Sequence, residues 1–283
     1  MITNYKTAVK NIRNILKKYI VDNNLQSLII GISGGIDSTI CAALAKPICD
    51  ELNIPLIGRS ITIETNKKDE INRAREIGKY FCTEFKELDL TDDYNGLIKS
   101  IAKDEPSILL NTIEAKIRKG NVKARMRMIR LYDLSGAHKG MVLSTDNYTE
   151  YLCGFWTICG DVGDFSGLQY MWKTEVYKMA KYIATNEINK KTPDYKRRYM
   201  AIVNCINANP TDGLGITNSD LDQLGVKSYE EADKILQKYL SLKEKLTDYN
   251  QLKKMENHVL IKRYNNTHFK RNHPYEIKRE CII

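Results

Sequence analysis

The chain has 283 residues, of which 42% are hydrophobic and 28% charged, a balance typical of a globular protein that buries a sizeable core. No apolar stretch approaches the ~18 residues of a membrane span, and charges interrupt residues 1–20, so we expect neither a membrane span nor a secretory signal. The net charge of +9 suits a nucleic-acid partner, a phosphate-rich small molecule or simply a lysine-rich surface; the basic cluster at 190–198 is short, so we expect no nucleic-acid partner.

Hydrophobic periodicity predicts alternating helices and strands in the first third of the chain. In chain order we expect a helix at 5–23, a strand at 28–32, a helix at 38–52, a strand at 55–63, a helix at 66–81 and a strand at 85–90. Strands that alternate with helices are typical of a parallel sheet covered on both faces. The sequence therefore predicts an α/β fold with a doubly wound, Rossmann-like parallel sheet.

The rest of the chain is predicted to be mainly helical. We expect a helical segment at 92–135, a strand at 139–145, and helices at 147–155, 172–185, 228–246 and 250–264. Residues 187–226 show no firm pattern, and the last residues are predicted to be an irregular tail. No repeat or linker divides the chain, so we expect one domain, 1–283, with a helical C-terminal part.

The cysteines and histidines show no metal-binding pattern. Seven scattered cysteines include no C-x-x-C pair, and the four histidines lack metal-ligand spacing. We therefore expect free thiols and a cytoplasmic location.

The sequence Ser33-Gly34-Gly35-Ile36-Asp37-Ser38 stands where the first predicted strand turns into a helix. Glycines allow a phosphate to approach backbone N–H groups, and a helix N-terminus adds unpaired donors and a partial positive charge. The loop is neither a Walker A motif nor a G-x-G-x-x-G fingerprint. The acidic Asp37 suits a phosphate loop if it holds Mg²⁺; otherwise it caps the helix of a plain tight turn.

This string matches the S-G-G-x-D-S pyrophosphate loop of the N-type ATP pyrophosphatases, whose fold is that of the adenine nucleotide α-hydrolases. Within that group, residues 119–136, 142–180, 209–236 and 262–274 resemble the successive motifs of the NAD synthetase family. The resemblance runs from about residue 9 to 275 and includes no glutaminase domain, so 1–283 is expected to form one ammonia-dependent NAD synthetase domain. It also implies a homodimer.

The resemblance further implies which residues bind each ligand. Asp37 and Glu150 would hold Mg²⁺, and Asp37 and Lys173 would act in catalysis. The family's ATP-binding positions fall on Gly31, Ile32, Ser33, Gly34, Gly35, Ile36, Asp37, Ser38, Thr145, Lys173 and Thr211. Its deamido-NAD positions fall on Arg125, Asp164, Phe269 and Lys270.

The chain departs from the family pattern in the half that would bind deamido-NAD. Ile158 replaces a lysine and Phe269 replaces a histidine. Asp164 aligns only across a one-residue gap, which leaves Asp161 as the alternative. Arg59 stands near the family's ATP-binding arginine in an uncertain register.

The implied function is that of a carbon–nitrogen ligase: adenylation of deamido-NAD by ATP, followed by attack of ammonia to give NAD, AMP and pyrophosphate. One alternative is adenylation of another acceptor, such as a tRNA base or a different carboxylate. The other is a nucleotide-binding regulator without turnover, which would not need both carboxylates.

Overall fold

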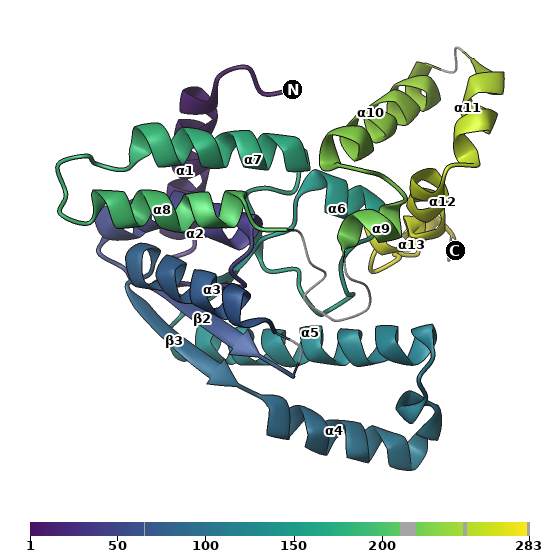
Figure 1. The fold of residues 1–283 in the computed structure, drawn as a ribbon, viewed down its shortest axis with the longest axis horizontal. Helices are drawn as coiled ribbons and strands as arrows, with labels where there is room; N and C mark the ends of the chain where they lie inside the picture. Colours follow the sequence, from purple (N-terminus) through teal and green to yellow (C-terminus); the bar gives the residue numbers. More distant parts are fainter. Residues whose placement is uncertain (65, 210–218, 246–247, 282–283) are drawn as a thin grey trace.

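The computed structural model describes residues 1–64, 66–209, 219–245 and 248–281, and its centre is a twisted parallel sheet (Figure 1). The strands are β1 (Ser27–Gly31), β2 (Leu56–Thr62), β3 (Glu84–Asp89), β4 (Gly140–Ser144) and β5 (Phe165–Ser166). Their spatial order is β3-β2-β1-β4-β5, and every adjacent pair is parallel. The predicted doubly wound α/β fold is thus confirmed, with β5 as an addition that the sequence did not predict.

Alternating side chains of the strands place one hydrophobic core on each face of the sheet. Leu28 and Ile30 of β1 pack in the first core, whereas Ile29 packs in the second. The first face is covered by α1 (Tyr5–Asp22), α2 (Ile36–Leu52), α3 (Lys68–Phe81), α7 (Lys173–Tyr182) and α8 (Tyr195–Ile206). The second face is covered by α4 (Thr91–Asp104), η1 (Pro106–Leu109) and α5 (Ile113–Ala137).

A separate group of helices lies beside the sheet, at the upper right of Figure 1. It contains α6 (Tyr148–Cys153), α9 (Asp220–Leu224), α10 (Tyr229–Lys245), α11 (Tyr249–Glu256), α12 (Val259–Asn266) and α13 (His268–Arg271). A third core, which includes Leu152, Leu236 and Leu260, joins α6 to the C-terminal helices. A short π-helix, η2 (Ile183–Glu187), and a short 3-10 helix, η3 (Arg279–Cys281), complete the described elements.

Several predicted boundaries need correction. The segment 250–264 is two helices, because His258 begins α12 by accepting a hydrogen bond from the backbone N–H of Leu260. The helix α8 lies inside 187–226, where no firm pattern was found. The helix predicted to start at Ser38 begins at Ile36, with Gly35 as its N-cap. Among the described residues, every helix is too short or too polar to cross a membrane.

The strand order fixes where a ligand can bind. The chain leaves β1 toward β2 on one side, and β4 lies on the other side, so the order reverses between β1 and β4. Open α/β sheets bind ligands outside the carboxyl ends of the strands at such a switch point. The glycine loop, Ser33 to Ser38, follows β1 at this point, and Thr145 follows β4.

Candidate functional site

The glycine loop owes its shape to the close packing of α3. Gly34 has φ +79°, and a Cβ there would lie 2.3 Å from the backbone oxygen of Glu70. Ser33 Oγ accepts a hydrogen bond from the N–H of Gly35 at 3.2 Å and lies 3.1 Å from Ser38 Oγ. No side chain of the described residues caps α2, so its first N–H groups remain available to an anion at the positive end of the helix dipole.

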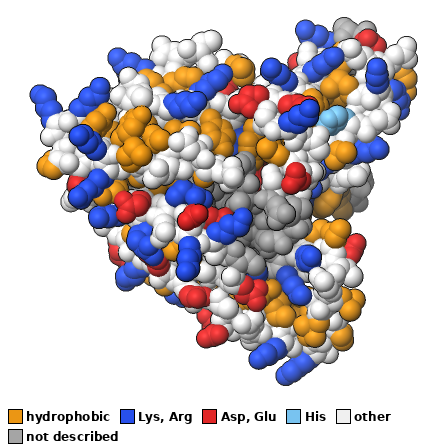
Figure 2. Space-filling view, viewed as in Figure 1, with side chains coloured by type: hydrophobic (Ala, Val, Ile, Leu, Met, Phe, Trp, Pro, Cys, Tyr) orange, Lys and Arg blue, Asp and Glu red, His pale blue; other side chains and the backbone are white. Residues whose placement is uncertain are grey.

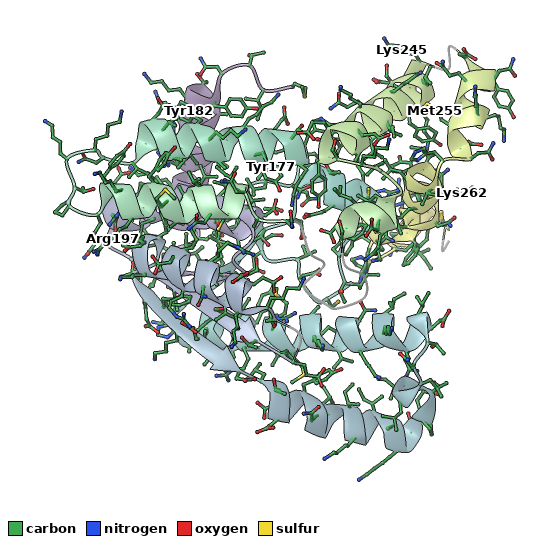
Figure 3. The ribbon with its side chains drawn as sticks, viewed as in Figure 1. Tyr177, Tyr182, Arg197, Lys245, Met255 and Lys262 are labelled. Carbon is green, nitrogen blue, oxygen red and sulfur yellow. The ribbon has the colours of Figure 1, made fainter. Side chains whose placement is uncertain are left out.

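A cavity of about 460 Å³ opens at the carboxyl edge of the sheet. The loop contributes Gly31, Ile32, Ser33, Gly35, Ile36 and Asp37 to its wall. Thr145, Glu150, Lys173 and Lys270 line it from four other segments. Tyr177 also lines it, from the middle of α7 (Figure 3). Most of the sequence-predicted ATP and metal residues therefore line one cavity; the described exceptions are Gly34 and Ser38, which belong to the same loop.

Lys173 forms the electrostatic centre of the site. Its Nζ lies 2.5 Å from Asp37 Oδ2 and 2.8 Å from Glu150 Oε1, and its side chain is only 6% exposed. The ring of Tyr229 lies under the same ammonium, 5.2 Å from Nζ to the ring centroid. A lysine is poorly placed for the dipole at a helix N-terminus, and these carboxylates compensate for it.

Burial and charge shift the pKa values of this cluster in defined directions. Burial opposes the charge of Lys173, but Asp37 and Glu150 outweigh it, so the pKa of Lys173 is raised well above its usual value. Burial also raises the pKa of Glu150 to about 7, although Lys173 acts against that rise. The pKa of Asp146 is raised as well, because Asp146 is buried beside Asp161 and Glu150.

Two residues that the sequence analysis missed hold the cluster in place. Asn147, fully buried, caps α6 by accepting from the N–H of Glu150 at 3.1 Å, and its Nδ2 donates to Asp37 Oδ1 at 2.9 Å. Asp233 of α10 accepts from Thr149 Oγ1 and from the N–H of Thr174. The pattern N-Y-T-E at 147–150 is a capping-box signal that identifies Asn147; no local signal identifies Asp233.

The residues expected to bind deamido-NAD fall in different places. Among the described residues, the cavity wall includes Lys270 but not Arg125, Asp164 or Phe269. Lys270 Nζ donates to the backbone oxygen of Gly154 at 2.8 Å and to that of Trp156. Thr211 lies outside the described residues.

The positions of Arg125, Asp164 and Phe269 have local causes. Arg125 Nε donates to the backbone oxygen of Ile158, on an exposed face of α5. Asp164 accepts from Tyr132 and from the N–H of Val142, so it fastens the sheet edge outside the cavity. Phe269 is 61% exposed on a four-residue helix.

Asp161 and Arg127 occupy the wall of the cavity instead. Asp161 Oδ1 accepts from the N–H of Thr157 at 2.8 Å, and burial raises the pKa of Asp161 to about 6 although Lys270, Arg125 and Arg127 lower it. Arg127 Nε donates to the backbone oxygen of Ile61 at 3.1 Å. The structure thus favours Asp161, the alternative of the sequence analysis, over Asp164 as a cavity residue.

The arrangement can bind a nucleoside triphosphate and bring charged groups to its phosphates. The N-terminus of α2 and the lysine suit phosphate oxygens, and two carboxylates suit a hard cation. Among the described residues, no group of three or more His, Cys, Asp or Glu side chains is arranged to hold a metal. A cation between Asp37 and Glu150 would therefore complete its shell with water and phosphate oxygens, as Mg²⁺ commonly does.

Comparison with known proteins gives consistent matches along the chain. The family model described as NAD synthase matches residues 8–274. An NH(3)-dependent NAD(+) synthetase from Finegoldia magna is 31% identical over 243 residues, 86% of this chain and 88% of that protein. One from Thermoplasma acidophilum is 30% identical over 279 residues, 97% of this chain and 99% of that protein.

Solved structures support the same fold. An NMN synthetase from Francisella tularensis superposes with a TM-score of 0.73 at 22% identity over 98% of both chains. An NH3-dependent NAD synthetase from Campylobacter jejuni superposes with a TM-score of 0.66 at 20% identity, over 98% of this chain and 100% of that chain.

Proposed function

Because the chain belongs to the NAD synthase family, we propose that it is a ligase that converts deamido-NAD to NAD with ATP and ammonia. The nicotinate carboxylate attacks the α-phosphorus of ATP, the bond from that phosphorus to the bridging oxygen breaks, and pyrophosphate leaves. Ammonia then attacks the activated carbonyl carbon, the bond to AMP breaks, and a proton is lost. No covalent bond to the protein forms, so the residues position charge and exclude water.

The observation that carries this proposal is the convergence of the glycine loop, Lys173, Asp37 and Glu150 on one cavity. The N–H groups of α2 bind phosphate oxygens, and Lys173 stabilises negative charge that develops as pyrophosphate leaves. Thr145 hydrogen-bonds the nucleotide from the end of β4. For deamido-NAD we propose Asp161, Arg127 and Lys270 from the cavity wall; Arg125, Asp164 and Phe269 remain predictions outside that wall in this chain.

We propose Mg²⁺ as the metal, held by Asp37 and Glu150. The fit rests on donor chemistry: Asp37 and Glu150 both line the cavity, their shared contact with Lys173 Nζ holds the two carboxylates close together, and carboxylate oxygens are ligands that Mg²⁺ prefers. When bound there, Mg²⁺ neutralises phosphate charge. Asp37→Ala tests this assignment, since a folded variant that releases pyrophosphate at the wild-type rate would contradict it.

We also propose a homodimer, one domain per chain and a cytoplasmic location. Hydrophobic side chains gather where α4, η1 and the start of α5 meet, at the lower right of Figure 2, and Leu109, Leu110 and Ile113 are all more than half exposed there. A second copy of the chain is the occupant we propose for this surface. Seven free cysteines support a reducing compartment.

One reaction tests the proposed function. The protein is mixed with ATP, Mg²⁺, ammonium and deamido-NAD, and NAD and AMP are measured by chromatography. Equal amounts of NAD and AMP are expected. Folded protein that binds ATP yet forms neither product would retain the pyrophosphatase fold and direct the search to another acceptor.

A further inference from the structure

An arginine of α3 reaches the phosphate loop from outside the motif. Arg73 Nε donates to the backbone oxygen of Gly34 at 3.0 Å, and its side chain lines the cavity beside Ser33 and Gly35. We infer that Arg73 is a further phosphate-binding residue, which binds the terminal phosphates of ATP and the pyrophosphate they become. The inference rests on the proposed function, because that function supplies the phosphates.

The position of Arg73 is fixed by the backbone of α3. A Cβ on Gly34 would lie 2.3 Å from Glu70 O and 3.0 Å from Ala74 N, so the turn of α3 that carries Arg73 packs directly against the loop. This packing and the hydrogen bond to Gly34 O place a cation at the loop before a ligand arrives.

Among the described residues, the other cations that line the cavity already have partners; Arg263 donates Nε to Cys153 O, and its guanidinium stacks on Phe155. Lys173 is paired with Asp37 and Glu150, and Arg59 with Glu84 at 2.6 Å. Lys270 donates to two backbone oxygens, and Arg127 donates to Ile61 O and Asn66 Oδ1.

Arg73 differs from these cations. Within the described part of the chain, its hydrogen bond to Gly34 uses Nε alone, and no carboxylate forms an ion pair with it. The two terminal nitrogens remain for a ligand, and a planar guanidinium binds phosphate oxygens through paired N–H groups. The carbonyl that Arg73 contacts belongs to the loop expected to carry the phosphates, so its free nitrogens lie at the phosphate end of the cavity.

The same helix offers a matched control. Arg75 lies two residues further along α3, is exposed, and pairs with Glu87 at 2.6 Å on the outer surface. Arg75→Ala removes the same charge from the same helix without touching the cavity. Any difference in pyrophosphate affinity between Arg73→Ala and Arg75→Ala is therefore due to the position of the arginine and not to the change in net charge.

Titration calorimetry with inorganic pyrophosphate and with AMP, in the presence of Mg²⁺, tests the inference on the full chain. We expect Arg73→Ala to raise the Kd for pyrophosphate about tenfold, the effect of losing charge-assisted hydrogen bonds, and to leave the Kd for AMP unchanged. Arg73→Lys keeps a charge without the planar fork and should fall between wild type and Arg73→Ala. Arg75→Ala should match wild type.

Two outcomes would overturn the inference. Pyrophosphate affinity of Arg73→Ala and Arg73→Lys equal to that of Arg75→Ala would show that Arg73 does not bind phosphate. Equal loss of AMP and pyrophosphate affinity would show that Arg73 only shapes the loop. If Arg73→Ala does not fold, Arg73→Lys decides by the same comparison.

The proposed function fails separately. If the wild-type protein binds pyrophosphate through Arg73 but forms no NAD from deamido-NAD, the proposed synthetase reaction is wrong, while the assignment of Arg73 as a phosphate-binding residue stands. If Arg73→Ala binds pyrophosphate as tightly as wild type and NAD formation is normal, the assignment of Arg73 is wrong, while the proposed synthetase reaction stands.

Discussion

The ammonium of Lys173 lies 2.5 Å from Oδ2 of Asp37, although the two residues lie in the first turns of different helices and are 136 positions apart in sequence. The lysine also reaches Glu150, so one cation forms ion pairs with two carboxylates that the cavity brings together. Removing such a cation leaves buried negative charges without compensation, which costs more than the pair itself contributes. The site is therefore held together by the same charges that we propose act on ATP.

Lys173→Met should destabilise the ligand-free protein by about 3 kcal/mol, because Asp37 and Glu150 would face each other unpaired. NAD formation should fall to background in the same variant. Urea unfolding measures the first effect and the coupled assay the second. Lys178→Met is the matched control, since Lys178 is an exposed lysine of the same helix. A Lys173→Met protein as stable as wild type would contradict the charge argument.

Gly34→Ala should abolish ATP binding and destabilise the protein by about 2 kcal/mol. Residue 34 has φ +79°, which alanine rarely adopts, and the new Cβ would lie 2.3 Å from Glu70 O. The loop therefore has to move away from α3. Calorimetric titration with ATP and thermal unfolding measure the two effects. Gly136→Ala is the control, because a Cβ there meets nothing within 4 Å. Normal ATP affinity in Gly34→Ala would show that the loop shape is not required.

Asp161→Asn should change the pH dependence of stability. The folded-state pKa of Asp161 is raised to about 6 from an unfolded value near 3.8, so the folded protein keeps a proton that the unfolded chain releases. Its contribution to stability is complete below pH 3.8 and is lost as the pH rises through 6. The Tm advantage of Asp161→Asn over wild type should thus grow from near zero at pH 4 to its maximum above pH 7.

The same variant should lose NAD formation, because asparagine can keep the hydrogen bond from Thr157 but not the charge near Lys270 and Arg127. Thermal unfolding across pH 4 to 8, with the assay at each pH, checks both effects. A constant Tm difference across that range would mean that Asp161 titrates normally in the fold.

The features that were easiest to predict from the sequence are those formed by one short, continuous segment. Ser33 to Ser38 form a single turn between one strand and one helix, so the match to the S-G-G-x-D-S pattern can be read from six consecutive residues. The sheet followed from alternating periodicities, but β5 has only two residues and owes its existence to pairing with β4, which no local pattern records. Likewise, Asp164 aligned with a family residue, and only the fold shows that its carboxylate is bound to Tyr132 and Val142 at the sheet edge.

The residues that support the site could not be predicted for a related reason. Arg73 meets the loop across 39 positions, and Asp233 meets Thr149 across 84. An arginine on a helix or an acidic residue in an amphipathic one has an ordinary surface role in most proteins. Their positions in the site come from how α3 and α10 pack, which depends on the whole core.

Asp233→Ala should lower kcat and destabilise the protein by about 3 kcal/mol. Asp233 is 2% exposed and receives hydrogen bonds from Thr149 Oγ1 and Thr174 N, while Lys173 N donates to the same Thr149 oxygen. This clamp fixes the N-termini of α6 and α7, which carry Glu150 and Lys173. Losing it moves both groups together.

The kinetic readout separates positioning from simple instability. Asp233→Asn keeps one acceptor and should recover part of kcat, whereas KM for ATP should change less than kcat in both variants because the phosphate loop itself is untouched. Lys234→Ala, an exposed neighbour on α10, should match wild type. Wild-type kcat in folded Asp233→Ala would show that α10 supports the fold without orienting the site.

Leu110→Lys combined with Ile113→Lys should convert the proposed dimer to monomers. Leu110 and Ile113 are 54% and 67% exposed, at the junction of η1 and α5, and burying such side chains against a second copy is the simplest account of their exposure. Two lysines placed there would meet their symmetry mates in an isologous interface and repel them.

Light scattering should give twice the 32.6 kDa chain mass for wild type and the single mass for the variant. Ile277→Lys, exposed in the C-terminal tail, should remain dimeric. A variant that stays dimeric would place the contact elsewhere, and a monomeric wild type would refute the dimer itself.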